Sequence, residues 1–127
     1  MDTDSAIELY RTFADDLRAV IEQQRRFRRV RFRPPAPRSG IRGRIRTRAV
    51  AMTPQLDDIE AELTYLLLRH HRPGTVMELG TFHGWSTTWL LSALRDNGTG
   101  RLHSFDRIDN VRATVPGDLA EGRWTFV

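Results

Sequence analysis

Two acids and two glycines are spaced so that they could hold one small ligand. Glu78 stands in an apolar run two residues before Gly80, and Gly84 follows four residues later. A carboxylate in an apolar strand is costly to bury unless a cation or hydrogen-bond donors meet it. Glycines at a strand-to-helix turn let backbone amides approach a carboxylate or phosphate at the helix N-terminus. A ligand with an ammonium group beside a carboxylate would satisfy both Glu78 and the turn.

An acid at the end of the next predicted strand extends this candidate site. Asp106 comes 26 residues after Gly80, near the spacing at which an acid meets ribose hydroxyls in nucleotide-binding αβ folds. Ser86 and Thr87 can add hydroxyl donors in the first turn of the helix. An ordinary first-turn serine explains Ser86 equally well. The amino acid end of S-adenosylmethionine carries the required ammonium and carboxylate. The two acids and two glycines therefore predict a frame around an adenosine-bearing ligand.

The elements predicted around these residues alternate between strand and helix. We expect strands at 75–79 and 101–105, a helix at about 84–95 between them, and a third strand beginning at "RWTFV". The segment 109–123 contains a proline and two glycines, so any helix there should be short or broken. Strand–helix–strand order is typical of a right-handed parallel crossover. The sequence therefore predicts an α/β fold with a parallel sheet.

The residues before this unit are predicted to be largely helical. Residues 4–30 carry apolar side chains at three- and four-residue steps, which is typical of an amphipathic helix. A second helix is expected to begin at Thr53-Pro54, a cap followed by a proline at the first helical position. Its apolar face should comprise Leu56, Ile59, Leu63, Leu66 and Leu67. In the helix at 84–95, Trp85, Trp89, Leu90 and Leu94 are expected to pack on the sheet, although Trp85 could instead touch a ligand.

Composition narrows the class of protein. The chain has 127 residues of which 39% are apolar, enough for one modest domain. It has no cysteine, which fits a reducing cytoplasm. It lacks the long apolar run that spans a membrane, and its first residues lack the basic and apolar parts of an export signal. We therefore expect a cytoplasmic protein with no membrane partner.

Basic charge is concentrated in one segment. All 20 basic residues are arginines, and eleven of them lie between Arg25 and Arg48, where there is no acid. This arginine block could be a solvated arm, which is the usual role of a charge run. It could also contact a second subunit or an acidic substrate such as a nucleotide-linked sugar or coenzyme A. Binding to nucleic acid phosphates ranks last, because no recognised nucleic-acid-binding motif accompanies the block.

The stretch "VMELGTFHGWSTTWLLSALRDNGTGRLHSFDRIDN" resembles the first βαβ unit of class I S-adenosylmethionine-dependent methyltransferases. It is most similar to the small-molecule O-methyltransferase branch, which includes the catechol and caffeoyl-coenzyme A enzymes. Those enzymes carry E-x-G-x-x-x-G-x-S at strand one and an acid at the end of strand two. The matching residues here are Glu78, Gly80, Gly84, Ser86 and Asp106. A dinucleotide-binding turn would read G-x-G-x-x-G, and its close second glycine is missing.

The resemblance implies a role for each residue of the motif. Eight residues would contact S-adenosylmethionine: Glu78, Gly80, Thr81, Phe82, Gly84, Ser86, Asp106 and Arg107. Glu78 would lie close to the methionine part, directly or through water or backbone amides. Ser86 would hydrogen-bond the cofactor's carboxylate, and Asp106 would hold the ribose hydroxyls. Arg107 and Ile108 would lie near the adenine.

The resemblance also implies a Rossmann-like fold that this chain supplies in part. The family's sheet has seven strands in the order 3-2-1-4-5-7-6, and this sequence provides strands one, two and the start of three. We expect a helical, arginine-rich extension at 1–52 and the first part of an S-adenosylmethionine-binding domain at 53–127, truncated in strand three. In the family, residues that position substrate, remove its proton or bind Mg²⁺ mostly follow strand four. We therefore assign no catalytic residue and no metal ligand, and a Mg²⁺ ion is expected only in an intact protein.

The activity implied by the resemblance is O-methylation of a small molecule. The acceptor would be a specialised-metabolite or sugar hydroxyl, the product S-adenosylhomocysteine, and the assembly a homo-oligomer. The alternative hypothesis is a protein without catalysis. It would be either a cofactor-binding remnant or an arginine-rich nucleic-acid-binding module.

Overall fold

The computed structural model describes residues 1–27 and 56–127, and these two ranges contain five helices and three strands. In chain order the elements are α1 (Thr3–Thr12), α2 (Ala14–Phe27), α3 (Asp58–His71), β1 (Thr75–Leu79), α4 (Trp85–Asn97), β2 (Arg101–Phe105), α5 (Gly117–Ala120) and β3 (Trp124–Phe126). From β1 onward strands and helices alternate, as the sequence predicts for an α/β fold.

The three strands form one parallel sheet in the order β1-β2-β3. Strands β1 and β2 are in register over their full length, from the pair Thr75–Arg101 to the pair Leu79–Phe105. Both have the bounds that the sequence predicts, and β3 and the short helix α5 also occur where they are expected. The parallel β1–α4–β2 unit is therefore confirmed.

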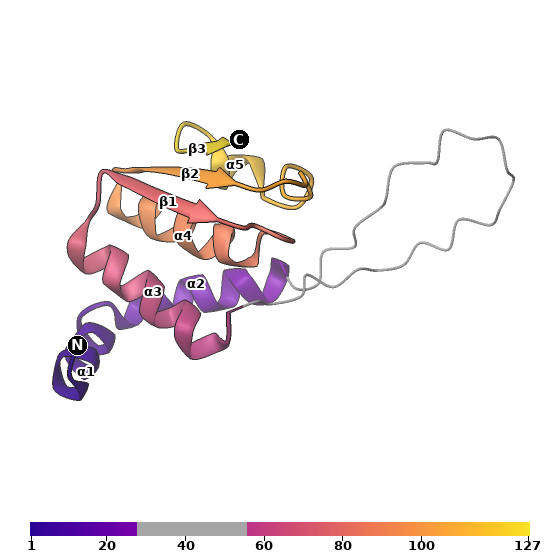
Figure 1. Ribbon diagram of the computed structural model, residues 1–127. Helices are drawn as coiled ribbons and strands as arrows, with labels where there is room; N and C mark the ends of the chain where they lie inside the picture. Colours follow the sequence, from indigo (N-terminus) through magenta and orange to yellow (C-terminus); the bar gives the residue numbers. More distant parts are fainter. Residues whose placement is uncertain (28–55) are drawn as a thin grey trace, which may run out of the picture.

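Helix α4 lies between the sheet and the N-terminal helices (Figure 1). Leu91 and Leu94 share a core with Leu102 of the sheet. Trp85 and Trp89 belong instead to a second core, built with residues of α1, α2 and α3. The expectation that both tryptophans pack on the sheet is therefore wrong. Because α4 is covered on both sides, apolar residues surround it and their spacing does not reveal which side each one faces.

The predicted helix at 4–30 is two helices within the described residues. The chain leaves the helical conformation at Phe13, which has φ −110° and ψ 21° and ends α1, and α2 starts at the next residue. The apolar spacing runs on across this break, because Leu9 before it and Leu17 after it enter the same core. A continuous spacing therefore predicted one helix where there are two. Residues 28–30 lie outside the described ranges.

Helix α3 begins later than predicted. Its N-cap is Asp57, whose carboxylate accepts from the amide of Glu60 at 2.8 Å, and the Glu60 carboxylate accepts from the amide of Asp57 at 3.2 Å. This reciprocal capping box fixes the first turn. Thr53 and Pro54 lie outside the described residues.

The buried face of α3 also differs from the prediction. Ile59 is 66% exposed, while Ala61, Tyr65 and Leu66 are buried. Tyr65 packs edge-on against Trp89 of α4, with ring centroids 6.2 Å apart. The sequence pattern emphasised the leucines and missed the tyrosine that carries the helix–helix contact.

Arg69 of α3 joins three helices. Its guanidinium donates to the hydroxyl of Tyr65 at 2.9 Å and lies 2.8 Å from the carboxylate of Asp16 on α2 and 3.7 Å from that of Asp96 on α4. It also lies over the ring of Phe13, 5.0 Å from the centroid. The Arg69 side chain is only 10% exposed, so these contacts replace its hydration. Arg69 therefore helps to fix the N-terminal helices to the αβ unit.

Replacing Arg69 should weaken the whole fold. We expect Arg69→Ala to lower the free energy of unfolding by about 2 kcal/mol, because it leaves buried acceptors without their charged donor. The control is Arg18→Ala, which removes an exposed ion pair to Asp15 and should cost less than about 1 kcal/mol. Urea denaturation followed by circular dichroism measures both. Equal losses in the two variants would contradict the bridging role.

Candidate functional site

The turn between β1 and α4 has an unusual backbone. Three of its residues have positive φ, namely Gly80 at 81°, Phe82 at 44° and Gly84 at 85°. A Cβ at Gly84 would lie only 3.2 Å from the side chains of Thr114 and Val115, whereas at Gly80 it would meet open space. Gly84 is thus required by both conformation and packing, and Gly80 by conformation alone. These glycines therefore set the conformation of the turn without any contribution from a ligand.

Asp106, at the end of β2, is hydrogen-bonded to this turn. Its Oδ2 accepts from the backbone amides of Thr81 at 2.7 Å and Phe82 at 3.1 Å, and from the Thr81 hydroxyl at 3.0 Å. Oδ1 accepts a longer bond, 3.3 Å, from the amide of Ile108. The structure therefore brings the predicted turn and the predicted acid together. It also shows two turn amides donating to Asp106 itself.

These donors stabilise the charged form of the carboxylate. The backbone amides of Thr81 and Phe82, in that order, hold the pKa of Asp106 well below its ordinary value of 3.8. Asp106 is half-buried at the carboxyl end of the sheet. An ionised acceptor is therefore held in a fixed position there, with its Oδ1 oxygen less engaged than Oδ2.

Glu78 is buried among hydroxyl groups. Its side chain is 7% exposed and accepts from Ser86 at 2.6 Å, from Thr87 at 2.9 Å and from Ser104 at 2.6 Å. The first two donors come from the first turn of α4 and the third from β2. The sequence predicts that a ligand's ammonium group meets the Glu78 carboxylate. In the structure three hydroxyl groups of the chain donate to it instead. We call Glu78 and its three donors the Glu78 network.

The Glu78 network extends to the third strand. The indole Nε1 of Trp124 donates to the hydroxyl oxygen of Ser104 at 2.9 Å, and Ser104 donates in turn to Glu78. Sequence reasoning named Ser86 and Thr87 as hydroxyl donors to a ligand rather than to Glu78, and it missed Ser104 and Trp124. One signal was present: Glu78 and Ser104 are both fourth in predicted five-residue strands, and in a parallel pair they lie side by side.

The side chains of the remaining predicted residues lie outside these networks, although the amides of Phe82 and Ile108 donate to Asp106. Phe82 is 40% exposed and its ring stacks on His83, with centroids 3.9 Å apart. Arg107 and Ile108 are exposed beyond the end of β2. Of the arginine block, Arg25 and Arg26 are described, in the last turn of α2. The other residues of the block lie outside the described ranges.

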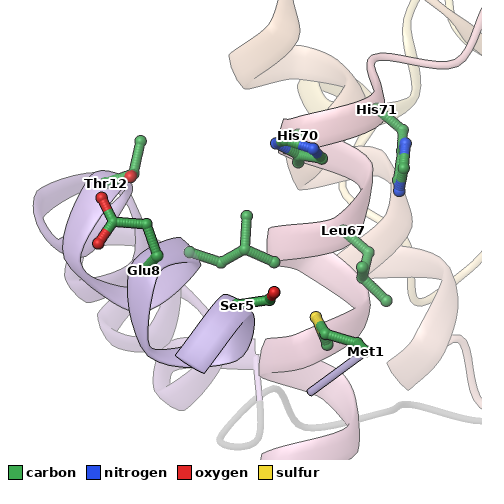
Figure 2. Close-up of a pocket in the computed structure, with 8 residues that line it drawn as sticks. Met1, Ser5, Glu8, Thr12, Leu67, His70 and His71 are labelled. Carbon is green, nitrogen blue, oxygen red and sulfur yellow. The ribbon is translucent and has the colours of Figure 1, made fainter. Parts of the chain in front are cut away.

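A separate cavity of about 460 Å³ lies between α1 and α3. Figure 2 shows Ser5, Glu8 and Thr12 on α1, across from His70 and Leu67 on α3. The cavity contains none of the predicted site residues.

Among the residues that the structure describes, no cluster of three or more histidine or acidic side chains could hold a metal ion. The same ranges hold no helix long and apolar enough to cross a membrane.

Comparison with protein families finds a match in the αβ part of the chain. A family model described as a methyltransferase domain matches residues 77–127. This match supports a methyltransferase domain. The matched part begins within β1, and it includes the glycine turn, the Glu78 network, Asp106 and β3. Comparison with curated proteins and with solved structures found no match.

Removing the Glu78 carboxylate should destabilise the domain. We expect Glu78→Leu to lower the free energy of unfolding by about 3 kcal/mol, because buried hydroxyl groups lose their acceptor. Glu78→Gln should cost less, since the hydroxyls can turn to accept from the amide. The control is Glu8→Leu on the exposed side of α1. Thermal and urea denaturation measure the losses, and a Glu78→Leu variant as stable as the control would contradict this role.

The hydrogen bonds of Asp106 should persist in mild acid. Because its folded pKa lies below its ordinary 3.8, its stabilising effect is present above 3.8 and is lost only as pH falls through the lower folded value. NMR titration of the Thr81 and Phe82 amides should show no transition at 3.8 or above. In Asp106→Asn the acid-dependent shift of both amides should disappear. A wild-type midpoint at 3.8 or higher would refute the assignment.

Proposed function

We propose that this chain binds S-adenosylmethionine at the carboxyl ends of β1 and β2, as part of a class I, Rossmann-like methyltransferase. The observation that carries the proposal is the contact between Asp106 and the glycine turn. This contact links the carboxyl ends of the two parallel strands β1 and β2. Folds of this kind bind nucleotides at that edge of the sheet. The methyltransferase match over residues 77–127 supports the same conclusion.

The residues present fit such a cofactor, with two adjustments to the expected roles. Asp106 Oδ1 has one long hydrogen bond among the described residues, so it has room to accept from a ribose hydroxyl. The backbone at Gly80 borders open space, so a ligand can approach the turn closely. Thr81 and Phe82, however, donate their amides to Asp106. In this proposal they line the site and hold the acid, while Arg107 lies near the adenine.

The second adjustment concerns the methionine end. Ser86 already donates its hydroxyl hydrogen to Glu78, and Glu78 is nearly inaccessible. We propose that Glu78 acts indirectly, by fixing the first turn of α4. Gly84 provides no side-chain cap there, and in this proposal the backbone amides of Ser86 and Thr87 donate to the cofactor's carboxylate. Ser86 would donate to that carboxylate only after turning away from Glu78.

The chemistry of the proposal is methyl transfer to oxygen. When bound, S-adenosylmethionine supplies a sulfonium-activated methyl group for direct displacement by an acceptor hydroxyl. This chain's own residues orient that group through Asp106 and the start of α4, and none of them is assigned as the base. The proposed acceptor is a small molecule, a specialised metabolite or a sugar. A homo-oligomeric, cytoplasmic enzyme completes the proposal. The described residues offer no cluster that could hold Mg²⁺, so no step is assigned to that ion.

Calorimetric titration of the 127-residue chain with S-adenosylhomocysteine tests the site. We expect micromolar binding, weakened about tenfold or more in Asp106→Asn because a ribose hydroxyl loses its charged acceptor. The control is Asp109→Asn, since Asp109 lies three residues away and pairs with Arg112 instead. Circular dichroism establishes that each variant is folded.

The outcomes separate the parts of the proposal. A folded wild-type chain that does not bind S-adenosylhomocysteine would refute the cofactor site. Equal weakening in both variants would remove Asp106 from it. Binding without methyl transfer to any hydroxylated acceptor would favour a cofactor-binding remnant over an enzyme.

A further inference from the structure

A second cleft lies at the opposite ends of the strands, where β2 and β3 begin. It encloses about 410 Å³, and Arg101, Arg123, Glu121 and the turn at Gly98 are among the residues that line it. Asp106 and the glycine turn lie at the carboxyl ends of the same strands, so the cleft is distinct from the proposed cofactor site. It does not depend on the proposed function.

The two arginines of this cleft are neighbours in the sheet. Leu102 of β2 pairs with Trp124 of β3, and each of the two arginines directly precedes one of these paired residues. The amide of Leu102 also donates to the carbonyl of Arg123 at 2.8 Å. Arg101 and Arg123 therefore stand at adjacent positions where the two strands begin. Like charges at adjacent positions of neighbouring strands repel one another. An anion bound between them would remove that cost.

The arginines differ in how they are held. Arg123 donates to the carbonyl oxygens of Leu119 at 2.7 Å and Asp118 at 3.2 Å, at the end of α5. These bonds fix its guanidinium and leave its other nitrogen atoms available. Arg101 is exposed, and its side chain makes no hydrogen bond or ion pair within the described residues. The cleft therefore offers one oriented and one adaptable guanidinium.

The rest of the lining shows what else a ligand would meet. Glu121 is exposed and forms no ion pair with either arginine among the described residues. Gly98 and Gly122 have positive φ, and a Cβ on either would meet nothing within 4 Å. Bare backbone therefore forms part of the wall and admits close approach. The C-terminal end of α4 also lies here, and its partial negative charge favours a ligand that contacts the arginines rather than the helix end.

We propose that this cleft binds a phosphate monoester of a polyhydroxylated molecule, the class of sugar phosphates. The phosphate lies between Arg101 and Arg123, because guanidinium groups bind phosphate oxygens through paired, charge-assisted hydrogen bonds. Glu121 accepts from a hydroxyl of the ligand, which gives this carboxylate a partner. The volume of about 410 Å³ exceeds that of a phosphate ion alone and leaves room for the sugar.

Titration calorimetry of the full chain with ribose 5-phosphate tests this proposal. We expect binding that Arg101→Ala weakens about tenfold or more, the effect of losing a charge-assisted hydrogen bond. Arg101 makes no contact that the fold needs, so this variant should remain folded. The matched control is Arg18→Ala on α2, whose side chain is 79% exposed and which should bind as the wild type does.

Ribose and inorganic phosphate serve as the other two probes, at equal ionic strength. Ribose alone should not bind, and inorganic phosphate should bind more weakly than the ester. Absence of ribose 5-phosphate binding, or equal affinity in the Arg101 and Arg18 variants, would overturn the site. If inorganic phosphate binds as tightly as the ester, or if Glu121→Gln does not weaken the ester, the sugar part of the proposal is wrong.

Discussion

The burial of one carboxylate ties the αβ unit together. Glu78 lies on β1, and its donors come from α4 and β2, with Trp124 of β3 joined through Ser104. A buried acid without donors would be strongly destabilising, so these elements must hold their relative positions. The start of α4 and the end of β1 are thereby fixed, and so is the turn between them. The proposed cofactor site depends on that turn.

Asp106 fixes the same turn from the other side. It binds the turn amides at the end of β2, while the Glu78 network fixes the helix that follows. The two acids thus stabilise the two sides of the turn in different ways. Glu78 is buried and accepts from hydroxyls, whereas Asp106 is partly exposed and accepts mainly from backbone amides. The hydroxyls around Glu78 and the amides around Asp106 explain why two acids occur near the ends of neighbouring strands. An ordered turn of this kind needs little rearrangement to receive a ligand, which reduces the entropy cost of binding.

Sequence reasoning found the β1–α4–β2 unit because its signals are local. Apolar runs of strand length and the glycines of the strand-to-helix turn mark the element boundaries directly, and both glycines have positive φ in the structure. It did not find the break at Phe13, since the apolar spacing continues across it. It misassigned Trp85 and Trp89 because α4 is buried on both sides. It named Ser86 and Thr87 as donors but did not pair them with Glu78, and it missed Ser104. A hydroxyl side chain carries no sign of its partner until the strands are paired.

The double burial of α4 has a consequence for how this chain can be divided. Trp85 and Trp89 belong to a core shared with α1, α2 and α3, whereas the family match begins only at residue 77. A piece cut to that match would carry two large indole rings on an uncovered helix face. The stretch that the family model matches is therefore shorter than the stretch that shares this core. The N-terminal helices supply the side of the core that lies outside the match.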